Sequence, residues 1–371
     1  MKYSFLILVV LSLTTSCTTD HSSSKIVPEK KFDKFQSVYQ LTGKSRKDMR
    51  QEDLPGLFFK MWTTDSLLIV YDIFAGKSNY FYIYNKYDYS LKSTFGRKGA
   101  GPGEGNYVGD AFFDQKNGAI FQHMQDKMKL FRYDLDSALA LGAKYIPSSV
   151  ATPVDGFFQE ADDNNFYTYS KPATDPVNVG NSVLTVINRK TGSQRQTGTH
   201  FLKPDAFADN MARTNFTMGT LIVSPDKKRA VSGYVRWNTL AFLDLNDESK
   251  NYILTGPDEF TPKKDENGQI IRDINCNWGY YSIAPGGDYI FGVYYGGPRN
   301  VLQPDGENRE AFPNTVHIFD WEGNAVAKLE LSKYTDGIVV DWDRKMLITA
   351  NPTAIDPIVE YDLSEVKELF H

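Results

Sequence analysis

Three aspartates stand where short apolar runs begin, and carboxylates that converge on one point can bind a hard cation. They occur in "VGDAFF", "VDGFF" and "TDGIV", as Asp110, Asp155 and Asp336. Ca²⁺ takes about six to eight oxygen ligands, so three carboxylates would supply part of its coordination shell. The alternative is turn chemistry, because aspartate next to glycine is common where a chain reverses. A calcium site is therefore one hypothesis for these residues, and ordinary turns are the other.

A second group of residues combines aromatic rings with arginines. Arg236 and Trp237 occur in "YVRWN", Trp278 follows a long polar stretch, and Tyr295 and Arg299 lie in "YYGGPRN". Exposed aromatic rings stack on sugars or peptide side chains, and a guanidinium group binds carboxylates in a planar, bidentate manner. These residues predict a binding site, unless their rings pack in the interior instead.

The glycine-rich stretch "FGRKGAGPGEG", residues 95–105, could accept an anion through Arg97, Lys98 and its backbone N–H groups. A phosphate-binding loop, however, leads into a helix, and the residues that follow here alternate aromatic and β-branched runs as strands do. The other interpretation is a structural corner, in which Arg97 pairs with Glu104 and the glycines allow positive φ angles.

Known catalytic motifs are missing from the sequence. It has no H-E-x-x-H, G-x-S-x-G, C-x-x-C or P-loop lysine pattern. The histidines are scattered, and no base adjacent to Cys276 would activate its thiol. We therefore expect a protein that is not an enzyme and needs no cofactor, with Ca²⁺ as the one ion for which candidate ligands stand out.

The N-terminus predicts export and lipid attachment. Residues 1–16 combine Lys2, an apolar run too short to span a bilayer, and small residues before Cys17, as in a bacterial lipoprotein signal peptide. Lipid on Cys17 and a flexible polar tether over residues 17–33 would hold a domain at the outer membrane, facing the periplasm or the cell surface. The alternative is an ordinary signal peptide followed by an incidental cysteine.

Composition argues against some classes of protein and favours others. The formal net charge of −5 argues against a nucleic-acid partner, which requires a concentrated basic surface. The chain has only two cysteines, Cys17 and Cys276, so no intrachain disulfide framework is expected. Its 371 residues exceed a usual single core, which favours two domains or one repeat architecture.

One strand pattern recurs about every fifty residues along the chain. Its six copies end in a polar turn residue, at Asn85, Asp134, Asn188, Asp244, Asp320 and Asp362. An apolar hairpin precedes each copy and a further strand follows, which makes a unit of four antiparallel strands, A to D. One such sheet cannot bury both of its faces alone. We therefore predict an all-β protein, a six-bladed β-propeller of four-stranded blades over residues 34–371.

The same assignment sorts the connections between strands by length. The A-to-B and C-to-D turns share one face and are all expected to be short, whereas most long segments join B to C or D to A on the opposite face. We call the latter the long-loop face and expect binding there, because long loops in compact domains are commonly functional. The ring can be closed by an N-terminal strand at 35–41, which we favour, or by a C-terminal strand at 365–370.

The glycine-rich loop between two propeller strands resembles loops of the TolB-like and NHL-like six-bladed propeller lipoproteins of bacterial envelopes. The other five inter-blade loops lack its Gly-Pro-Gly-Glu string, so strict NHL repeats are not indicated. The resemblance implies a periplasmic or surface lipoprotein with a binding or scaffolding role. The three aspartates in turn resemble part of the site of calcium-dependent lactonases and related six-bladed hydrolases, although the Glu and Asn ligands of those enzymes are not matched here.

These observations predict an envelope-anchored lipoprotein that binds a glycan, a peptide or a partner protein of the envelope through its long-loop face. The candidate contacts are Arg97, Lys98, Glu104, Arg236, Trp237, Trp278, Tyr295 and Arg299. The alternative is a calcium-dependent hydrolase, lactonase or lyase whose site lies at the mouth of the central channel, with Asp110, Asp155 and Asp336 as metal ligands.

Overall fold

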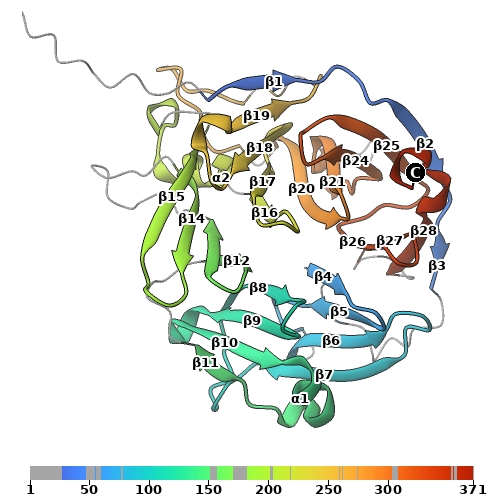
Figure 1. The fold of residues 1–371 in the computed structure, drawn as a ribbon. Coiled ribbons are helices and arrows are strands. Elements are labelled where there is room, and N and C mark those ends of the chain that lie inside the picture. The colour runs from blue at the N-terminus through green and yellow to red at the C-terminus, as the bar shows by residue number, and fades with distance from the viewer. Residues whose placement is uncertain are drawn as a thin grey trace, which may run out of the picture.

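The fold is the predicted ring of six sheets, each made of four or five strands (Figure 1). The structure is a computed structural model. The structure describes residues 27–46, 55, 60–76, 78–150, 157–169, 182–200, 204–217, 219–258, 260, 262–273, 275–302, 308–351, 354 and 357–370.

The blades follow one another in chain order, and each begins with its innermost strand. Blade 1 contains β4 (Lys60–Thr63), β5 (Leu67–Tyr71), β6 (Asn79–Asn85) and β7 (Leu91–Arg97). Blade 2 contains β8 (Val108–Asp114), β9 (Ala119–Met124), β10 (Lys129–Asp134) and β11 (Ser148–Val150). Blade 3 contains β12 (Phe157–Ala161), β13 (Asn165–Tyr169), β14 (Ser182–Asn188) and β15 (Gln194–Thr199).

Blades 4 to 6 take further strands from the N-terminus. Blade 4 contains β16 (Gly219–Val223), β17 (Arg229–Tyr234), β18 (Thr239–Asp244), β19 (Tyr252–Thr255) and β1 (Glu29–Lys31). Blade 5 contains β20 (Asn277–Gly286), β21 (Tyr289–Pro298), β24 (Thr315–Asp320), β25 (Ala325–Leu331) and β2 (Ser37–Leu41). Blade 6 contains β26 (Gly337–Asp341), β27 (Met346–Ala350), β28 (Ile358–Asp362) and β3 (Lys44–Ser45). A separate hairpin joins β22 (Asn300–Leu302) to β23 (Asn308–Glu310).

Helices are few and short in the described residues. The α-helices are α1 (Leu135–Leu141) and α2 (Asn210–Thr217). The 3₁₀-helices are η2 (Gln125–Lys127), η3 (Gly142–Lys144), η4 (Pro204–Ala206), η5 (Glu248–Lys250), η6 (Leu363–Glu365) and η7 (Lys367–Leu369).

The repeated polar residue closes the third strand of every blade. Each of the six predicted positions is the last residue of such a strand: β6, β10, β14, β18, β24 and β28. Its side-chain oxygen accepts a backbone N–H two or three residues later, as from Tyr87 to Asn85 (2.8 Å) and from Glu322 to Asp320 (3.0 Å). The recurrence therefore has a local cause, because an Asn or Asp side chain at this point satisfies a donor that the C-to-D turn leaves free.

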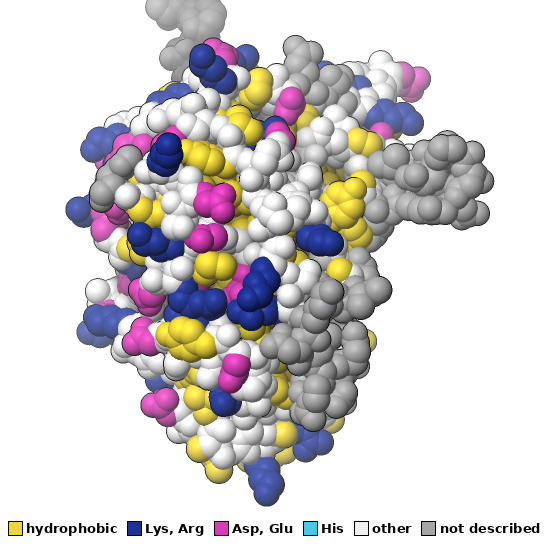
Figure 2. Space-filling model, turned by 90° about the vertical axis from the view of Figure 1, so that its right-hand side faces the viewer, with side chains coloured by type: hydrophobic (Ala, Val, Ile, Leu, Met, Phe, Trp, Pro, Cys, Tyr) yellow, Lys and Arg dark blue, Asp and Glu magenta, His cyan; other side chains and the backbone are white. Residues whose placement is uncertain are grey.

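The N-terminal segment 29–45, called the strap below, runs along the outer edges of three successive blades (Figure 1). Strand β1 pairs in parallel with β19, β2 in parallel with β25, and β3 antiparallel with β28. Figure 2 views the side of the molecule that bears β2 and β3, and the Lys/Arg and Asp/Glu side chains described there are interspersed. Three edges that would otherwise stay open are thus paired within the chain.

The ring is closed from the N-terminus, as we favoured, but by a different strand. Residues 35–41 add a fifth strand to blade 5, and the two-residue β3 completes blade 6. Residues 365–370 form no strand: Glu365 ends η6, and Lys367–Leu369 form η7. The expected tether also ends earlier, because residues 29–31 pair with blade 4 as β1. The propeller therefore begins before residue 34.

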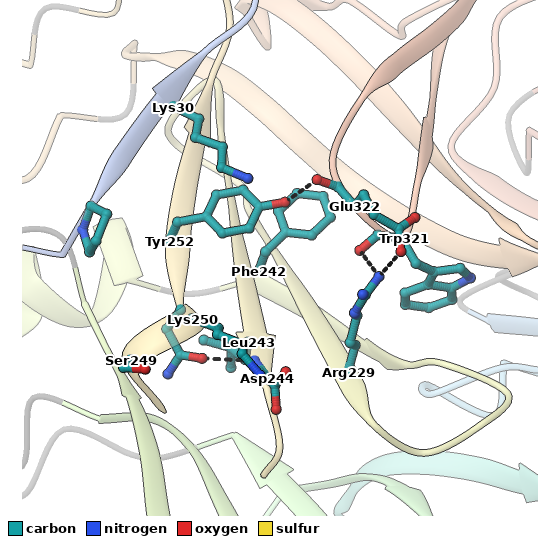
Figure 3. Close-up of a pocket in the computed structure, with 12 residues that line it drawn as sticks. Lys30, Arg229, Phe242, Leu243, Asp244, Ser249, Lys250, Tyr252, Trp321 and Glu322 are labelled. Atoms are coloured by element: carbon teal, nitrogen blue, oxygen red, sulfur yellow. Dashed lines mark hydrogen bonds and ion pairs between the residues drawn. The ribbon is translucent and has the colours of Figure 1, made fainter. Parts of the chain in front are cut away.

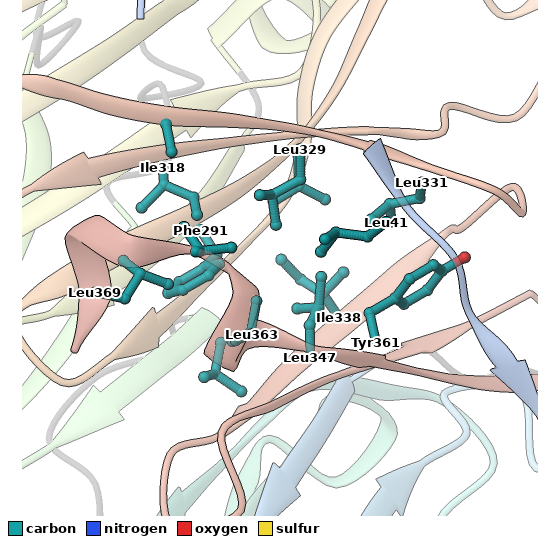
Figure 4. Close-up of a cluster of buried hydrophobic side chains, with 14 of the residues drawn as sticks. Leu41, Phe291, Ile318, Leu329, Leu331, Ile338, Leu347, Tyr361, Leu363 and Leu369 are labelled. Atoms are coloured by element: carbon teal, nitrogen blue, oxygen red, sulfur yellow. The ribbon is translucent and has the colours of Figure 1, made fainter. Parts of the chain in front are cut away.

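The strap is fixed by apolar side chains as well as by strand pairing. The Phe35 ring lies 5.1 Å from that of Phe32 and 4.5 Å from the imidazole of His317 on β24. Burial lowers the pKa of His317 to about 3, so the ring packs as a neutral group. Leu41 is 3% exposed and belongs to a core cluster between blades 5 and 6, which Leu369 joins from the C-terminus (Figure 4).

A buried ion pair and a buried hydrogen bond cross the seam between the last and first blades. Lys86, between β6 and β7, lies 2.9 Å from Asp341 at the end of β26, and both side chains are almost fully buried. Glu360 on β28 accepts a hydrogen bond from the Tyr89 hydroxyl (2.8 Å) and pairs with Arg46 beside the strap (2.5 Å). The seam is thus charged, whereas the core of each blade is apolar.

The long connections lie on the predicted face, with one exception. Segments 98–107, 200–218, 256–276 and 299–314 all join D to A or B to C. The C-to-D connection of blade 2, residues 135–147, is not short as expected, because it holds α1 and η3. The Asp134 side chain accepts the Ser137 N–H (3.0 Å) and thereby caps α1, whose apolar residues pack beside β7.

Candidate functional site

The glycine-rich loop bonds to itself and to neighbouring connections. Arg97 lies 3.6 Å from Glu104, and the other Glu104 oxygen accepts the Gly101 N–H at 2.9 Å. Lys98 donates to the Phe74 carbonyl (3.3 Å), and Gly103 holds a φ of +71°. The carboxylate of Glu104 thus occupies the position against the backbone N–H that a bound anion would take. This geometry favours the structural corner over an anion site.

The aspartates are not gathered into a metal site in the described residues. Lys60 Nζ lies 2.7 Å from Asp110 Oδ1, which also accepts the Ala111 N–H at 2.8 Å. Asp336 is buried at the start of β26, and Asp155 lies outside the described residues. No group of three His, Cys, Asp or Glu side chains in the described part of the chain is placed to hold a metal. At Asp110 a lysine already supplies the positive charge that Ca²⁺ would bring.

We expect Ca²⁺ to leave the melting temperature of the purified protein unchanged. A cation that binds only the folded state at about a hundred times its Kd adds about 2.7 kcal/mol of stability, which differential scanning calorimetry detects. EDTA-treated protein gives the baseline, and Mg²⁺ at equal concentration controls for ionic strength. A rise with Ca²⁺ that Mg²⁺ does not reproduce would restore the calcium-dependent enzyme as a hypothesis.

Arginine and aromatic side chains converge on the long-loop face of blades 4 and 5. The Cζ atoms of Arg236 and Arg299 lie 5.0 and 4.8 Å from the centre of the Trp278 ring. The rings of Tyr281 and Tyr295 lie 5.6 and 5.5 Å from that of Trp278. We call these five residues the Trp278 cluster. Four of its members are predicted contacts, and the fifth, Tyr281, was not predicted from the sequence.

Two irregularities in blade 5 bring these rings together. Residues three apart point to opposite sides of a regular strand, so Trp278 and Tyr281 on β20 should not meet. The pairing of β20 with β21 shifts register between Trp278 and Tyr280 and again between Tyr280 and Ser282. A bulge of this kind turns a side chain toward the other face, which explains why alternation alone could not identify Tyr281.

Arg236 is carried to Trp278 by a close backbone contact. Gly279 donates its N–H to the Val235 carbonyl at 2.7 Å, and a Cβ at Gly279 would lie 1.6 Å from the Trp237 carbonyl oxygen. Only glycine therefore permits the β17–β18 connection to rest on β20. Arg236 Nη1 donates to the Asp273 carbonyl (3.3 Å) and lies 2.8 Å from Cys276 Sγ.

Two donors of the Trp278 cluster are buried without an acceptor among the described residues, Arg236 Nε and Trp278 Nε1. A buried donor without an acceptor costs about 1–3 kcal/mol, so an acceptor from a ligand would be favourable there. Arg236 also has no carboxylate partner in the described part of the chain. The cluster therefore combines positive charge, flat rings and N–H groups that lack an acceptor among the described residues.

The other predicted contacts do not join this cluster. The half-buried Trp237 ring packs 5.6 Å from that of Phe216 on α2, beside a small core that also contains Phe207 and Ile270, which is the interior packing that the sequence had left open. It directly follows Arg236 in the turn between β17 and β18. Arg97, Lys98 and Glu104 belong to the corner between blades 1 and 2.

Comparison with known proteins settles the family. The model of TolB-like six-bladed propellers matches residues 55–343, most of the chain. The chain belongs to this TolB-like family. Among curated proteins, none matches. No helix in the described residues is long and apolar enough to cross a bilayer.

Two solved structures share the TolB-like propeller fold at low sequence identity. A candidate exported protein from Bacteroides fragilis NCTC 9343 is 11% identical, with a TM-score of 0.55 over 90% of this chain and 98% of that one. A DUF4221 family member from Bacteroides vulgatus ATCC 8482 is 12% identical, with a TM-score of 0.52 over 84% of this chain and 94% of that one. At these identities the likeness concerns the fold.

Proposed function

We propose that this TolB-like propeller is an exported, lipid-anchored binding module of the cell envelope. It holds a carboxylate-bearing glycan, peptide or partner protein at the Trp278 cluster and carries out no reaction on it. The observation that carries this proposal is the placement of two guanidinium groups within about 5 Å of one indole ring on the long-loop face.

The chemistry of the Trp278 cluster suits recognition of a carboxylate beside a ring or apolar chain. Stacking on Trp278 holds the planes of the Arg236 and Arg299 guanidinium groups, so less side-chain entropy is lost when a carboxylate binds. Tyr281 and Tyr295 add rings on which a sugar or peptide side chain can stack. Arginine, tryptophan and tyrosine orient bound groups, whereas hydrolysis would call for a nucleophile paired with a base.

Attachment to the envelope is supported by two further observations. The sequence begins with a signal-like segment that ends at Cys17, the proposed site of lipid attachment. One of the structural relatives, from Bacteroides fragilis, is itself a candidate exported protein. The lipid would hold the propeller at the outer membrane by way of the segment that precedes the strap.

The proposal is tested on an array of acidic and neutral glycans and peptides, probed with the mature chain without lipid. We expect acidic members to bind, and Arg236→Gln with Arg299→Gln to weaken binding about tenfold or more, because each charged hydrogen bond is worth about 1.5–3 kcal/mol. Arg272→Gln is the matched control, since Arg272 is exposed on the long connection between β19 and β20 but lies outside the cluster.

The melting temperature decides how a loss of binding is interpreted. If the double variant melts as the wild type does and no longer binds, the cluster is a binding site. If Arg272→Gln loses the ligand equally, or if the double variant binds as the wild type does, the proposed site is wrong.

A further inference from the structure

A hollow lies on the other side of the ring from the Trp278 cluster, where the strap meets blades 4 and 5. It has a volume of about 420 Å³ and is bounded by the start of β1, by β18 and β19, and by the turn after β24 (Figure 3). These walls lie at the C-to-D end of the blades, opposite the long-loop face. The volume is within the range of about 300–1,000 Å³ that small-molecule sites occupy.

Three aromatic rings, those of Phe242, Tyr252 and Trp321, line part of the wall. Phe242 and Tyr252 are cross-strand partners whose rings stack at 5.0 Å with an angle of 2° between their planes. Trp321 closes the side toward blade 5, and the Tyr252 hydroxyl donates to the Glu322 carbonyl at 2.5 Å. The hollow is therefore a preformed apolar surface held between two blades.

All but one of the charged side chains that line the hollow have an ion-pair or hydrogen-bond partner among the described residues. Glu322 pairs with Arg229, and Lys250 lies 3.3 Å from Asp247. The Asp244 carboxylate accepts two backbone N–H groups, those of Asn246 and Asp247, at 2.9 Å each. Two further side chains, Asn251 and Ser249, are bonded within the C-to-D turn, Asn251 to the Asp244 N–H and Ser249 to Asp247.

The remaining cation is Lys30 of the strap. Its Nζ lies 3.6 Å from the centre of the Tyr252 ring, directly beside the stacked pair (Figure 3). It forms no ion pair with any described residue, and the side chain is exposed at the rim of the hollow. An ammonium group without a carboxylate at the edge of an aromatic wall favours a ligand with an apolar ring and a negative charge.

We propose that this hollow binds a small aromatic carboxylate, with the ring against Phe242, Tyr252 and Trp321 and the carboxylate at Lys30. Because Lys30 belongs to the strap and the rings belong to blades 4 and 5, such a ligand touches all three. A ligand that binds only when the strap is docked would stabilise the strap against release from the blades. The site is independent of the Trp278 cluster and of the function proposed for it.

The test uses three probes with one ring and different charge: phenylacetate, 2-phenylethanol and phenethylamine. Saturation-transfer NMR on the full mature chain measures their affinities. We expect phenylacetate to bind about fivefold or more tightly than the alcohol, as one partly exposed charge pair of about 1 kcal/mol allows, and the amine to bind weakest. Equal affinities for the three probes, or no saturation transfer to phenylacetate, would overturn the proposal.

Variants locate the binding. Lys30→Gln should reduce the preference for phenylacetate over the alcohol, whereas Lys31→Gln should leave it unchanged, because Lys31 is the next residue of β1 and faces the other side of the sheet. The preference must persist in the Arg236→Gln/Arg299→Gln variant, which removes the guanidinium groups of the Trp278 cluster. A preference lost there, or kept in Lys30→Gln, would place the carboxylate elsewhere.

Discussion

Removal of residues 27–46 is expected to abolish cooperative unfolding of the propeller. The deletion takes β3 from blade 6, uncovers the edges of β19 and β25, and empties the position of Leu41 in the core between blades 5 and 6. Loss of a large buried side chain such as Leu41 costs about 2–5 kcal/mol, and net stabilities of domains are about 5–15 kcal/mol. The strap therefore carries a large share of the total.

Thermal unfolding followed by circular dichroism measures this effect. A chain that lacks only residues 18–26 is the matched control and should melt as the mature protein does. A synthetic peptide of residues 27–46 added to the shortened protein should restore part of the transition. If the strapless chain melts cooperatively at the temperature of the control, the strap is an accessory and not a part of the ring.

Lys86→Met is expected to destabilise the protein by about 3–5 kcal/mol, because it leaves the Asp341 carboxylate buried at the seam without its lysine. Arg344 lies 3.7 Å from the other Asp341 oxygen and should offset part of the loss. Equilibrium unfolding in urea gives the free energy. Lys116→Met is the control, since Lys116 and Asp163 form an exposed pair whose loss should cost less than about 1 kcal/mol.

The double variant Lys86→Met/Asp341→Leu distinguishes the cost of an unpaired buried charge from the cost of losing the pair itself. Removing both charges leaves no unpaired ion, so its stability should lie well above that of Lys86→Met. A single variant as stable as the wild type, or a double variant less stable than the single one, would contradict the role given to this pair in joining blade 6 to blade 1.

The repeat made the fold predictable from the sequence, because its signal is local. The polar residue that ends each third strand bonds to the next few backbone groups, so its spacing marks the blades without any knowledge of their packing. The order of strands in the ring followed, since neighbouring repeats can bury their sheets only against one another.

Features that depend on contacts distant in sequence were less predictable. β3 has only two residues and pairs with β28 across almost the whole chain, so no local pattern distinguishes it from a loop. Residues 35–41 have the alternation of a strand, but alternation does not say which edge they join. The helical connection at 135–147 was missed although Asp134 and the run "LDSALAL" are a cap and a good helix former.

The candidate site also contains residues that the sequence could indicate and one residue that it could not. Residue type singled out Arg236, Trp278, Tyr295 and Arg299, because aromatic rings stack on sugars and peptide side chains and arginine binds carboxylates. Tyr281 depends on two register shifts in blade 5 that no sequence pattern announces. Trp237 was placed with the contacts as an aromatic residue of the long-loop face, yet its ring packs against Phe216 on α2.

The most direct test of the binding function is a hydrogen-exchange footprint of the strongest acidic ligand from the array. Binding at the Trp278 cluster should slow exchange in residues 277–281 and 295–299 and leave the C-to-D ends of the blades unchanged. Protection confined to the C-to-D ends, or no protection at saturating ligand, would contradict the central claim that this propeller binds through its long-loop face.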